Sequence, residues 1–245
     1  MRLTRVYIPQ PLSPGAEVTL PESAAAHLTR VLRLGVGDAC IAFNGDGCDY
    51  AATLASVGKR EARLVIGQAT RVDRESALGI TLLQGVAKGE KMDLILQKAT
   101  ELGVQAIVPV WSQRSDVKLD GDRAAKRLEH WRNVVASACE QCGRAVVPAV
   151  VPPASLQAAL GALPPHDTRL LLDPVGAHSL RTLDLGADAA LCVAVGPEGG
   201  WSPLDREQLQ AAAFGGLRLG PRILRTETAG LAAIAALQAR FGDLI

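Results

Sequence analysis

From Ile80 to the end of the chain, short apolar stretches alternate with amphipathic segments. Each apolar stretch is about as long as a buried strand. This alternation is typical of a mainly parallel sheet with helices on both faces, so the sequence predicts an α/β fold. The expected strands are 80–83, 104–110, 146–150, 169–172, 189–195 and 217–219, and the expected helices are 91–102, 122–141, 155–160, 203–213 and 227–241.

The first seventy or so residues have a different pattern, with short strands close together in the sequence. Asn44-Gly45-Asp46-Gly47 is a strong hairpin signal, because these residues tolerate positive φ. Closely spaced short strands suggest a small barrel, and we expect domains at 1–73 and 74–245. The expected strands are 3–8, 40–43, 50–56 and 62–69, with one helix at 23–32.

Composition narrows the class of protein. Hydrophobic residues make up 48% and charged residues 21%, which is ordinary for a globular protein. No run approaches the roughly 20 apolar residues of a membrane helix, and the start lacks the pattern of a signal peptide, so we expect a cytoplasmic protein without membrane contact. A net charge of +1 leaves nucleic-acid binding open, provided that positive charge is concentrated locally.

The cysteines do not suggest a metal site or a disulfide framework. Their number, five, is odd, which fits a reducing compartment. Cys139 and Cys142 form a lone CxxC near the end of an expected helix, with no second pair for zinc. We interpret this pair as structural and expect no metal.

Three loops after expected strands stand out, at 170–174, 195–200 and 219–229. Ligands of open α/β sheets bind beyond the carboxyl ends of the strands. The second loop, VGPEGG, runs into a helix with Ser202 as N-cap, Pro203 at N1 and Asp205 in a capping box. It matches neither the P-loop motif GxxxxGK[ST] nor the dinucleotide-binding motif GxGxxG. The alternative that the chain is a nicotinamide-dependent dehydrogenase therefore lacks its main sequence evidence.

The third loop carries two arginines, two threonines and a glutamate between a short strand and an alanine-rich helix. Such a group of polar side chains beyond a strand end can bind a ligand. A structural interpretation stays open beside it: Thr226 would cap the last helix, Glu227 would complement its dipole, and the arginines would be solvated.

Long stretches of the chain resemble one known family. VGPEGGWS and LGPRILRTETAGLAAIAAL are similar to the two C-terminal motifs of the 16S ribosomal RNA uracil-N3 methyltransferases, a SPOUT family. The resemblance covers nearly the whole chain. It also includes HLTRVLRLGVGD at 27–38, KGEKMDLILQKATELGV at 88–104 and SACEQCGR at 137–144.

The resemblance implies a fold, a reaction and partners. The domain at 74–245 would be a trefoil-knotted SPOUT domain, preceded at 1–73 by a PUA-like RNA-binding β-barrel. S-adenosylmethionine would be held in the three loops and would methylate N3 of a uridine in 16S rRNA, as free RNA or within the 30S subunit. The family acts as a homodimer with sites near the subunit interface. The alternative function is a non-catalytic RNA-binding protein that retains the fold.

Residues of the three loops are candidates for the site that the resemblance implies. The uracil N3 proton must be removed or the anion stabilised, so Arg225, Glu227 and Arg222 are the catalytic candidates, with Glu198 as a second choice for the base. The expected cofactor residues are Leu172, Asp173, Gly196, Pro197, Glu198, Gly199, Gly200, Leu219, Gly220, Ile223, Leu224 and Thr226.

RNA contact needs local positive charge, because phosphates dominate affinity. The alternative for any one cation is a solvated surface charge. The expected RNA-binding residues are Arg2, Arg5, Arg30 and Arg33 in the small domain, and Lys88 and Lys91 at the start of the next helix.

Overall fold

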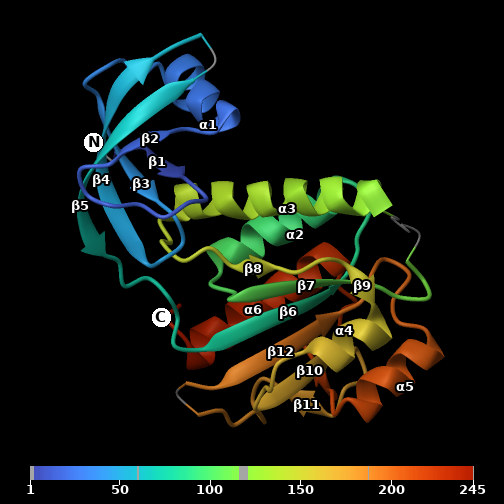
Figure 1. Cartoon of the computed structure of the whole chain (residues 1–245). Coiled ribbons are helices and arrows are strands. Elements are labelled where there is room, and N and C mark those ends of the chain that lie inside the picture. Colours follow the sequence, from blue (N-terminus) through green and yellow to red (C-terminus); the bar gives the residue numbers. More distant parts are fainter. Residues whose placement is uncertain (1–2, 60, 116–120, 187, 245) are drawn as a thin grey trace. The chain divides into compact units, whose positions relative to one another are not determined.

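The computed structural model describes residues 3–59, 61–115, 121–186 and 188–244. The chain forms two compact units, both drawn in Figure 1. Unit 1 comprises Met1–Glu75 and Ala136–Val147, and unit 2 comprises Ser76–Val135 and Pro148–Ile245. The predicted division into functional domains at residue 73 stays a prediction.

Unit 1 is built on a five-stranded sheet of order β1-β3-β4-β5-β2. The hairpin of β3 and β4 forms at the predicted place, with Gly45 and Gly47 at φ +95° and +87°. Only β1 and β3 pair in parallel among the strands of this sheet. Its elements are β1 (Arg5–Tyr7), β2 (Glu17–Thr19), α1 (Glu22–Ala26), the π-helical η1 (His27–Val31), β3 (Ala39–Phe43), β4 (Cys48–Val57) and β5 (Ala62–Arg71).

The second segment of unit 1 supplies partners for its first strand. Arg5 forms an ion pair with Asp49 and donates to the Arg144 carbonyl at 2.8 Å. The backbone N–H of Tyr7 donates to Glu140 at 2.9 Å. Unit 1 therefore includes residues more than a hundred positions away from its first strand.

Unit 2 has an eight-stranded sheet in which all strand pairings among the described residues are parallel. Its order is β11-β13-β10-β12-β6-β7-β8, with β9 beside β7. The strands are β6 (Gly79–Gly85), β7 (Ala106–Trp111), β8 (Ala149–Val150), β9 (Ala154–Ser155), β10 (Thr168–Leu172), β11 (His178–Ser179), β12 (Ala190–Val195) and β13 (Gly215–Arg218). The α/β prediction is confirmed, whereas the implied trefoil knot stays a prediction.

Helices cover both faces of this sheet. Leu82 of β6 lies beside Gly230 of the last helix, whereas Leu83 packs in a cluster with Leu156 and Leu209. Neighbouring residues of a strand point to opposite faces, so both faces are buried. The helices are α2 (Glu90–Glu101), α3 (Gly121–Cys142), α4 (Leu156–Ala162), α5 (Pro203–Ala211) and α6 (Thr226–Phe241). Within the described residues, no helix is both long and apolar enough to span a membrane.

Candidate functional site

The three loops singled out in the sequence lie together in unit 2. They follow β10, β12 and β13, which are parallel neighbours, so their carboxyl ends share one edge of the sheet. The backbone N–H of Asp173 donates to Leu217 of β13 at 3.0 Å. The hydroxyl of Thr226 donates to the Gly196 carbonyl at 2.6 Å. The predicted gathering of loops is therefore present.

A buried glutamine joins these loops to β6. The side-chain amide of Gln84 donates to Thr226 Oγ1 at 3.0 Å and to the Gly85 carbonyl at 2.9 Å. Gln84 is fully buried, and sequence reasoning missed it. Thr226 thus accepts from β6 and donates to the loop after β12, in addition to beginning α6.

The glycine loop at 196–200 lies closely against β6. A Cβ placed on Gly85 would lie 2.5 Å from Pro197, so no side chain fits there. Gly200 has φ +65° and closes a turn by donating to the Pro197 carbonyl at 2.8 Å. The predicted capping box of Ser202 and Asp205 is present at the start of α5.

Backbone of two loops borders open space. A Cβ on Gly200 or on Gly220 would meet no heavy atom within 4 Å, and Gly220 has φ +136°. The buried indole N–H of Trp201 has no hydrogen-bond partner among the described residues and lies beside Gly196. A ligand that hydrogen-bonds to exposed backbone fits such loops.

Other predicted cofactor residues differ in exposure. Leu172, Leu219 and Leu224 are half-buried, whereas Ile223 is 85% exposed in the single chain. The carboxylate of Asp173 accepts from Arg206 of α5 at 2.6 Å and from the Val175 N–H at 3.1 Å. This side chain therefore has protein partners of its own.

Two carboxylates of the site share one lysine. Lys91 Nζ lies 3.2 Å from Glu198 Oε1 and 3.8 Å from Glu227 Oε2. Glu198 also accepts from the Lys88 backbone N–H at 3.1 Å. Burial opposes its ionisation, but hydrogen bonds from backbone N–H groups and Lys91 outweigh this and lower the pKa of Glu198. Glu227 Oε2 is buried and has no hydrogen-bond partner among the described residues.

Three arginines lie at this edge of the sheet. Arg222 and Arg225 have exposed side chains, and the Arg225 backbone caps α6 by accepting from Thr228 and Ala229. Arg114, which follows β7, donates to the Gly199 carbonyl at 3.2 Å. Sequence reasoning missed Arg114, although its place after an expected strand is a usable signal.

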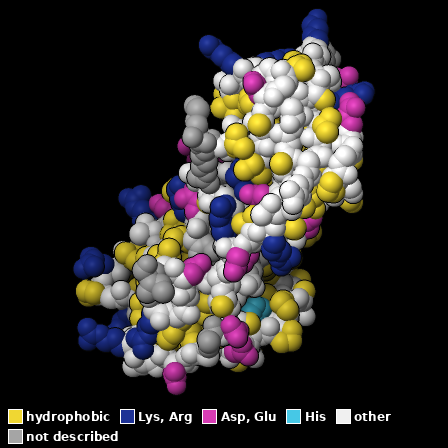
Figure 2. All heavy atoms as spheres, turned by 90° about the vertical axis from the view of Figure 1, so that its left-hand side faces the viewer, with side chains coloured by type: hydrophobic (Ala, Val, Ile, Leu, Met, Phe, Trp, Pro, Cys, Tyr) yellow, Lys and Arg dark blue, Asp and Glu magenta, His cyan; other side chains and the backbone are white. Residues whose placement is uncertain are grey.

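The predicted RNA-binding residues of unit 1 differ in accessibility. Arg30 and Arg33 are exposed, and Arg33 has φ +58°. Within unit 1, Figure 2 shows Lys and Arg side chains projecting from the end that carries α1 in Figure 1. The side chain of Arg5 is only 3% exposed in its pair with Asp49, and Arg2 lies outside the described residues.

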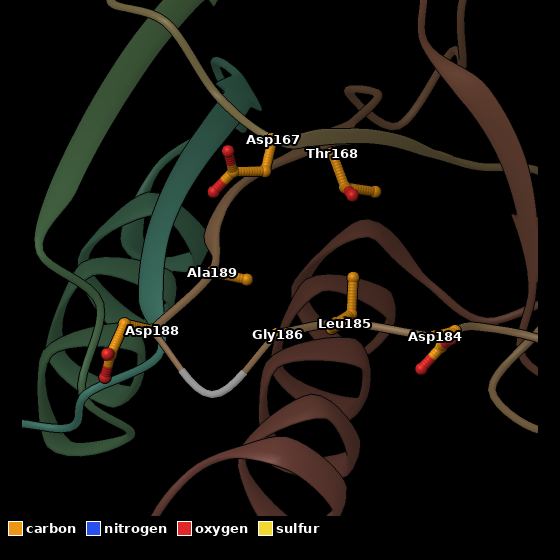
Figure 3. Close-up of a pocket in the computed structure, with 7 residues that line it drawn as sticks. All are labelled: Asp167, Thr168, Asp184, Leu185, Gly186, Asp188 and Ala189. Atoms are coloured by element: carbon orange, nitrogen blue, oxygen red, sulfur yellow. The ribbon is translucent and has the colours of Figure 1, made fainter.

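One cavity of unit 2 lies away from the three loops. It has a volume of about 370 Å³ and lies at the amino ends of β10 and β12 (Figure 3). Three aspartates in its lining make it a poor match for phosphate or carboxylate groups. Its lining consists of Asp167, Thr168, Asp184, Leu185, Gly186, Asp188 and Ala189.

The CxxC pair lies in α3, and neither of its cysteines forms a disulfide with another described residue. A hydrogen bond with Cys142, together with burial, raises the pKa of the Cys139 thiol. A thiol with a raised pKa is a poor metal ligand at neutral pH. Among the described residues, no group of three His, Cys, Asp or Glu side chains is arranged to hold a metal ion.

Comparison with known proteins gives matches over the whole chain. Residues 74–238 match the model of an RNA methyltransferase domain, and residues 20–67 match that of an RNA methyltransferase PUA domain. A ribosomal RNA small subunit methyltransferase E of Buchnera aphidicola is 33% identical over 99% of this chain and 98% of its own.

Two solved structures are also similar over their full length. One is a ribosomal RNA small subunit methyltransferase E from Neisseria gonorrhoeae bound to S-adenosyl methionine, with 43% identity, full coverage of both chains and a TM-score of 0.92. The other is a putative methyltransferase from Legionella pneumophila in complex with the same cofactor, with 36% identity, full coverage of both chains and a TM-score of 0.94.

Proposed function

Because the chain belongs to the family of ribosomal RNA small subunit methyltransferase E, we propose that it transfers a methyl group from S-adenosylmethionine to N3 of a uridine in 16S rRNA. The observation that carries the proposal is the edge of the unit 2 sheet, where three loops meet and leave backbone groups open. The substrate is free 16S rRNA or the 30S subunit.

Residues at this edge fit the cofactor. The backbone of Leu172, Gly196, Gly199, Leu219 and Gly220 would bind it, with Leu224 beside its base. When bound, S-adenosylmethionine supplies an activated methyl group on its sulfonium. The fixed loops orient donor and acceptor, and orientation is the main requirement of an in-line displacement.

Glu227 is the proposed base for the N3 proton. Its Oε2 has no hydrogen-bond partner among the described residues and only an ion pair with Lys91 at 3.8 Å, so the carboxylate keeps the capacity to accept a proton. Glu198 is a weaker candidate, because one of its oxygens already accepts from Lys88 and Lys91. Arg225 and Arg222 are exposed beside this position and would stabilise the uracil anion or bind a neighbouring phosphate.

RNA binding by unit 1 is proposed for Arg30 and Arg33, whose exposed side chains can reach phosphates. We leave Arg5 out of this surface because its guanidinium is buried with Asp49. Charge neutralisation by these arginines would supply affinity, while the loops of unit 2 would receive the target base.

A homodimer in the cytoplasm completes the proposal. Ile223, in a loop of the site, is 85% exposed, and a large apolar side chain in such a place is suited to an interface. Small half-buried alanines on α6 offer a face for close packing. Light scattering at micromolar concentration should therefore give twice the mass of the chain, and a monomeric mass would contradict this part of the proposal.

Three measurements test the activity. Calorimetry with S-adenosylmethionine should show one site per chain, methyl transfer to 16S rRNA should be detectable, and the modified position should map to N3 of one uridine.

Glu227→Gln and Arg225→Ala should each slow single turnover by about a hundredfold or more while retaining cofactor affinity. Cofactor binding without any methyl transfer to RNA would contradict the proposal, and absence of cofactor binding would favour a non-catalytic RNA-binding protein.

A further inference from the structure

Lys91 lies where it touches both carboxylates of the site. Its ammonium is 3.2 Å from Glu198 Oε1 and 3.8 Å from Glu227 Oε2. The side chains of Lys91, Glu198 and Glu227 are 38%, 28% and 15% exposed, so solvent screens these charges only in part. The three residues come from α2, the glycine loop and the start of α6, which are distant in sequence.

Lys91 forms a hydrogen bond with Glu198 and lies farther from Glu227. Glu198 Oε1 accepts from both the Lys91 ammonium and the Lys88 backbone N–H, which ties the glycine loop to the start of α2. The contact with Glu227 is longer than a hydrogen bond and is an ion pair only. Glu227 is thus oriented by a fixed positive charge, while its oxygen keeps its capacity to accept a proton.

We propose that Lys91 is a positioning residue for methyl transfer, which fixes Glu227 toward the target base through the cluster that it forms with Glu198. The inference rests on the proposed function, in which Glu227 takes the N3 proton. Without the ammonium, two carboxylates whose oxygens now lie within 4 Å of one point would repel one another. Glu227 would then turn away from its present direction.

This role replaces the expectation that Lys91 contacts RNA phosphates. One ammonium between two carboxylates leaves the cluster with a net charge of −1 when all three groups are ionised. Such a cluster attracts a phosphate poorly. Removing Lys91 should therefore leave RNA affinity and its salt dependence nearly unchanged.

The test compares Lys91→Met with a matched control on the same helix. Lys98 is 41% exposed and pairs with Glu101 at 2.9 Å, so Lys98→Met removes a comparable ion pair of α2 away from the site. Single-turnover rates are measured at saturating cofactor and RNA, with dissociation constants for both ligands. Lys91→Met should slow turnover by about tenfold or more with both affinities retained, and Lys98→Met should match the wild type.

Two further variants separate positioning from simple loss of structure. Lys91→Arg keeps the charge and should restore most of the rate. In Glu227→Gln the carboxylate that Lys91 positions is absent. The double variant with Lys91→Met should therefore turn over nearly as fast as Glu227→Gln alone. Normal turnover in Lys91→Met, or full additivity of the two substitutions, would overturn the inference. Normal turnover in Glu227→Gln would instead show that the proposed base is wrong.

Discussion

Gly85 and Pro197 lie so close that a Cβ on Gly85 would fall 2.5 Å from the Pro197 nitrogen. Gly85 ends β6, and Pro197 begins the turn of the glycine loop. Because Gly85 has no side chain, the glycine loop can run directly against the end of β6 at Pro197. The same approach brings Gly196, which accepts from Thr226, toward the end of β6.

Gly85→Ala should displace the glycine loop, because the added methyl group would meet backbone that cannot yield easily. Overpacking of this kind typically costs about 1–3 kcal/mol. We expect a lower denaturant midpoint and weaker binding of S-adenosylmethionine by calorimetry. The matched control is Gly161→Ala in α4, where a Cβ meets nothing within 4 Å. If both alanine variants bind the cofactor like the wild type, the close approach is unimportant.

Thr226→Val should loosen the junction between β6, the glycine loop and α6. The valine fills the same space but leaves the Gly196 carbonyl and the Gln84 amide without the hydroxyl that they share. A buried group that loses its partner costs about 1–3 kcal/mol. Melting temperature and cofactor affinity should both fall. Thr226→Ser keeps the hydroxyl and should stay near wild type, and equal losses in both variants would point to the methyl group instead.

Replacing Arg30 and Arg33 together by alanine should weaken RNA binding and flatten its salt dependence, because fewer counterions are released. Affinity for S-adenosylmethionine should not change, since both arginines belong to unit 1 and the three loops to unit 2. Binding to a 16S rRNA fragment is measured over a series of salt concentrations. Wild-type affinity and slope in the double variant would place the RNA surface elsewhere.

The Glu198 carboxylate should stabilise the protein in a pH-dependent way. Its pKa lies below the ordinary value of 4.5 in the folded chain, so its contribution is present above that pH and is lost as the pH falls through the folded pKa. The difference in urea midpoint between wild type and Glu198→Gln should therefore shrink from neutral pH to about pH 3. A constant difference would show that charge is not the cause.

Local signals predicted much of unit 2. The capping box of Ser202 and Asp205 depends on two residues that are three positions apart. The buried face of α2 depends on the spacing of apolar residues along one helix. Both features could therefore be predicted from the sequence. β9 and β11 could not, because strands of two residues are too short to show alternation. β13 begins at Gly215 rather than at the predicted Leu217, since glycines carry no hydrophobic pattern.

Partners distant in sequence limited the prediction of the site. Gln84 acts through Thr226, which is 142 positions away, and nothing around Gln84 indicates this contact. Arg5 is predicted from the sequence to bind RNA, because its carboxylate partner, Asp49, follows 44 positions later and no local pattern indicates the pair. The loops themselves were predictable, because their glycines and charges are adjacent in the sequence, whereas the pairing of side chains between loops was not.

Unit 1 is built from two separate segments of the chain, and this has a consequence for recombining genes within this family. Because Glu140 and Arg144 contribute partners to Tyr7 and Arg5, the first 75 residues are an incomplete module. A chimaera that exchanges only the N-terminal coding segment would combine Arg5 and Tyr7 of one parent with the α3 end of another. Both segments must be inherited together for unit 1 of a relative to be transplanted intact.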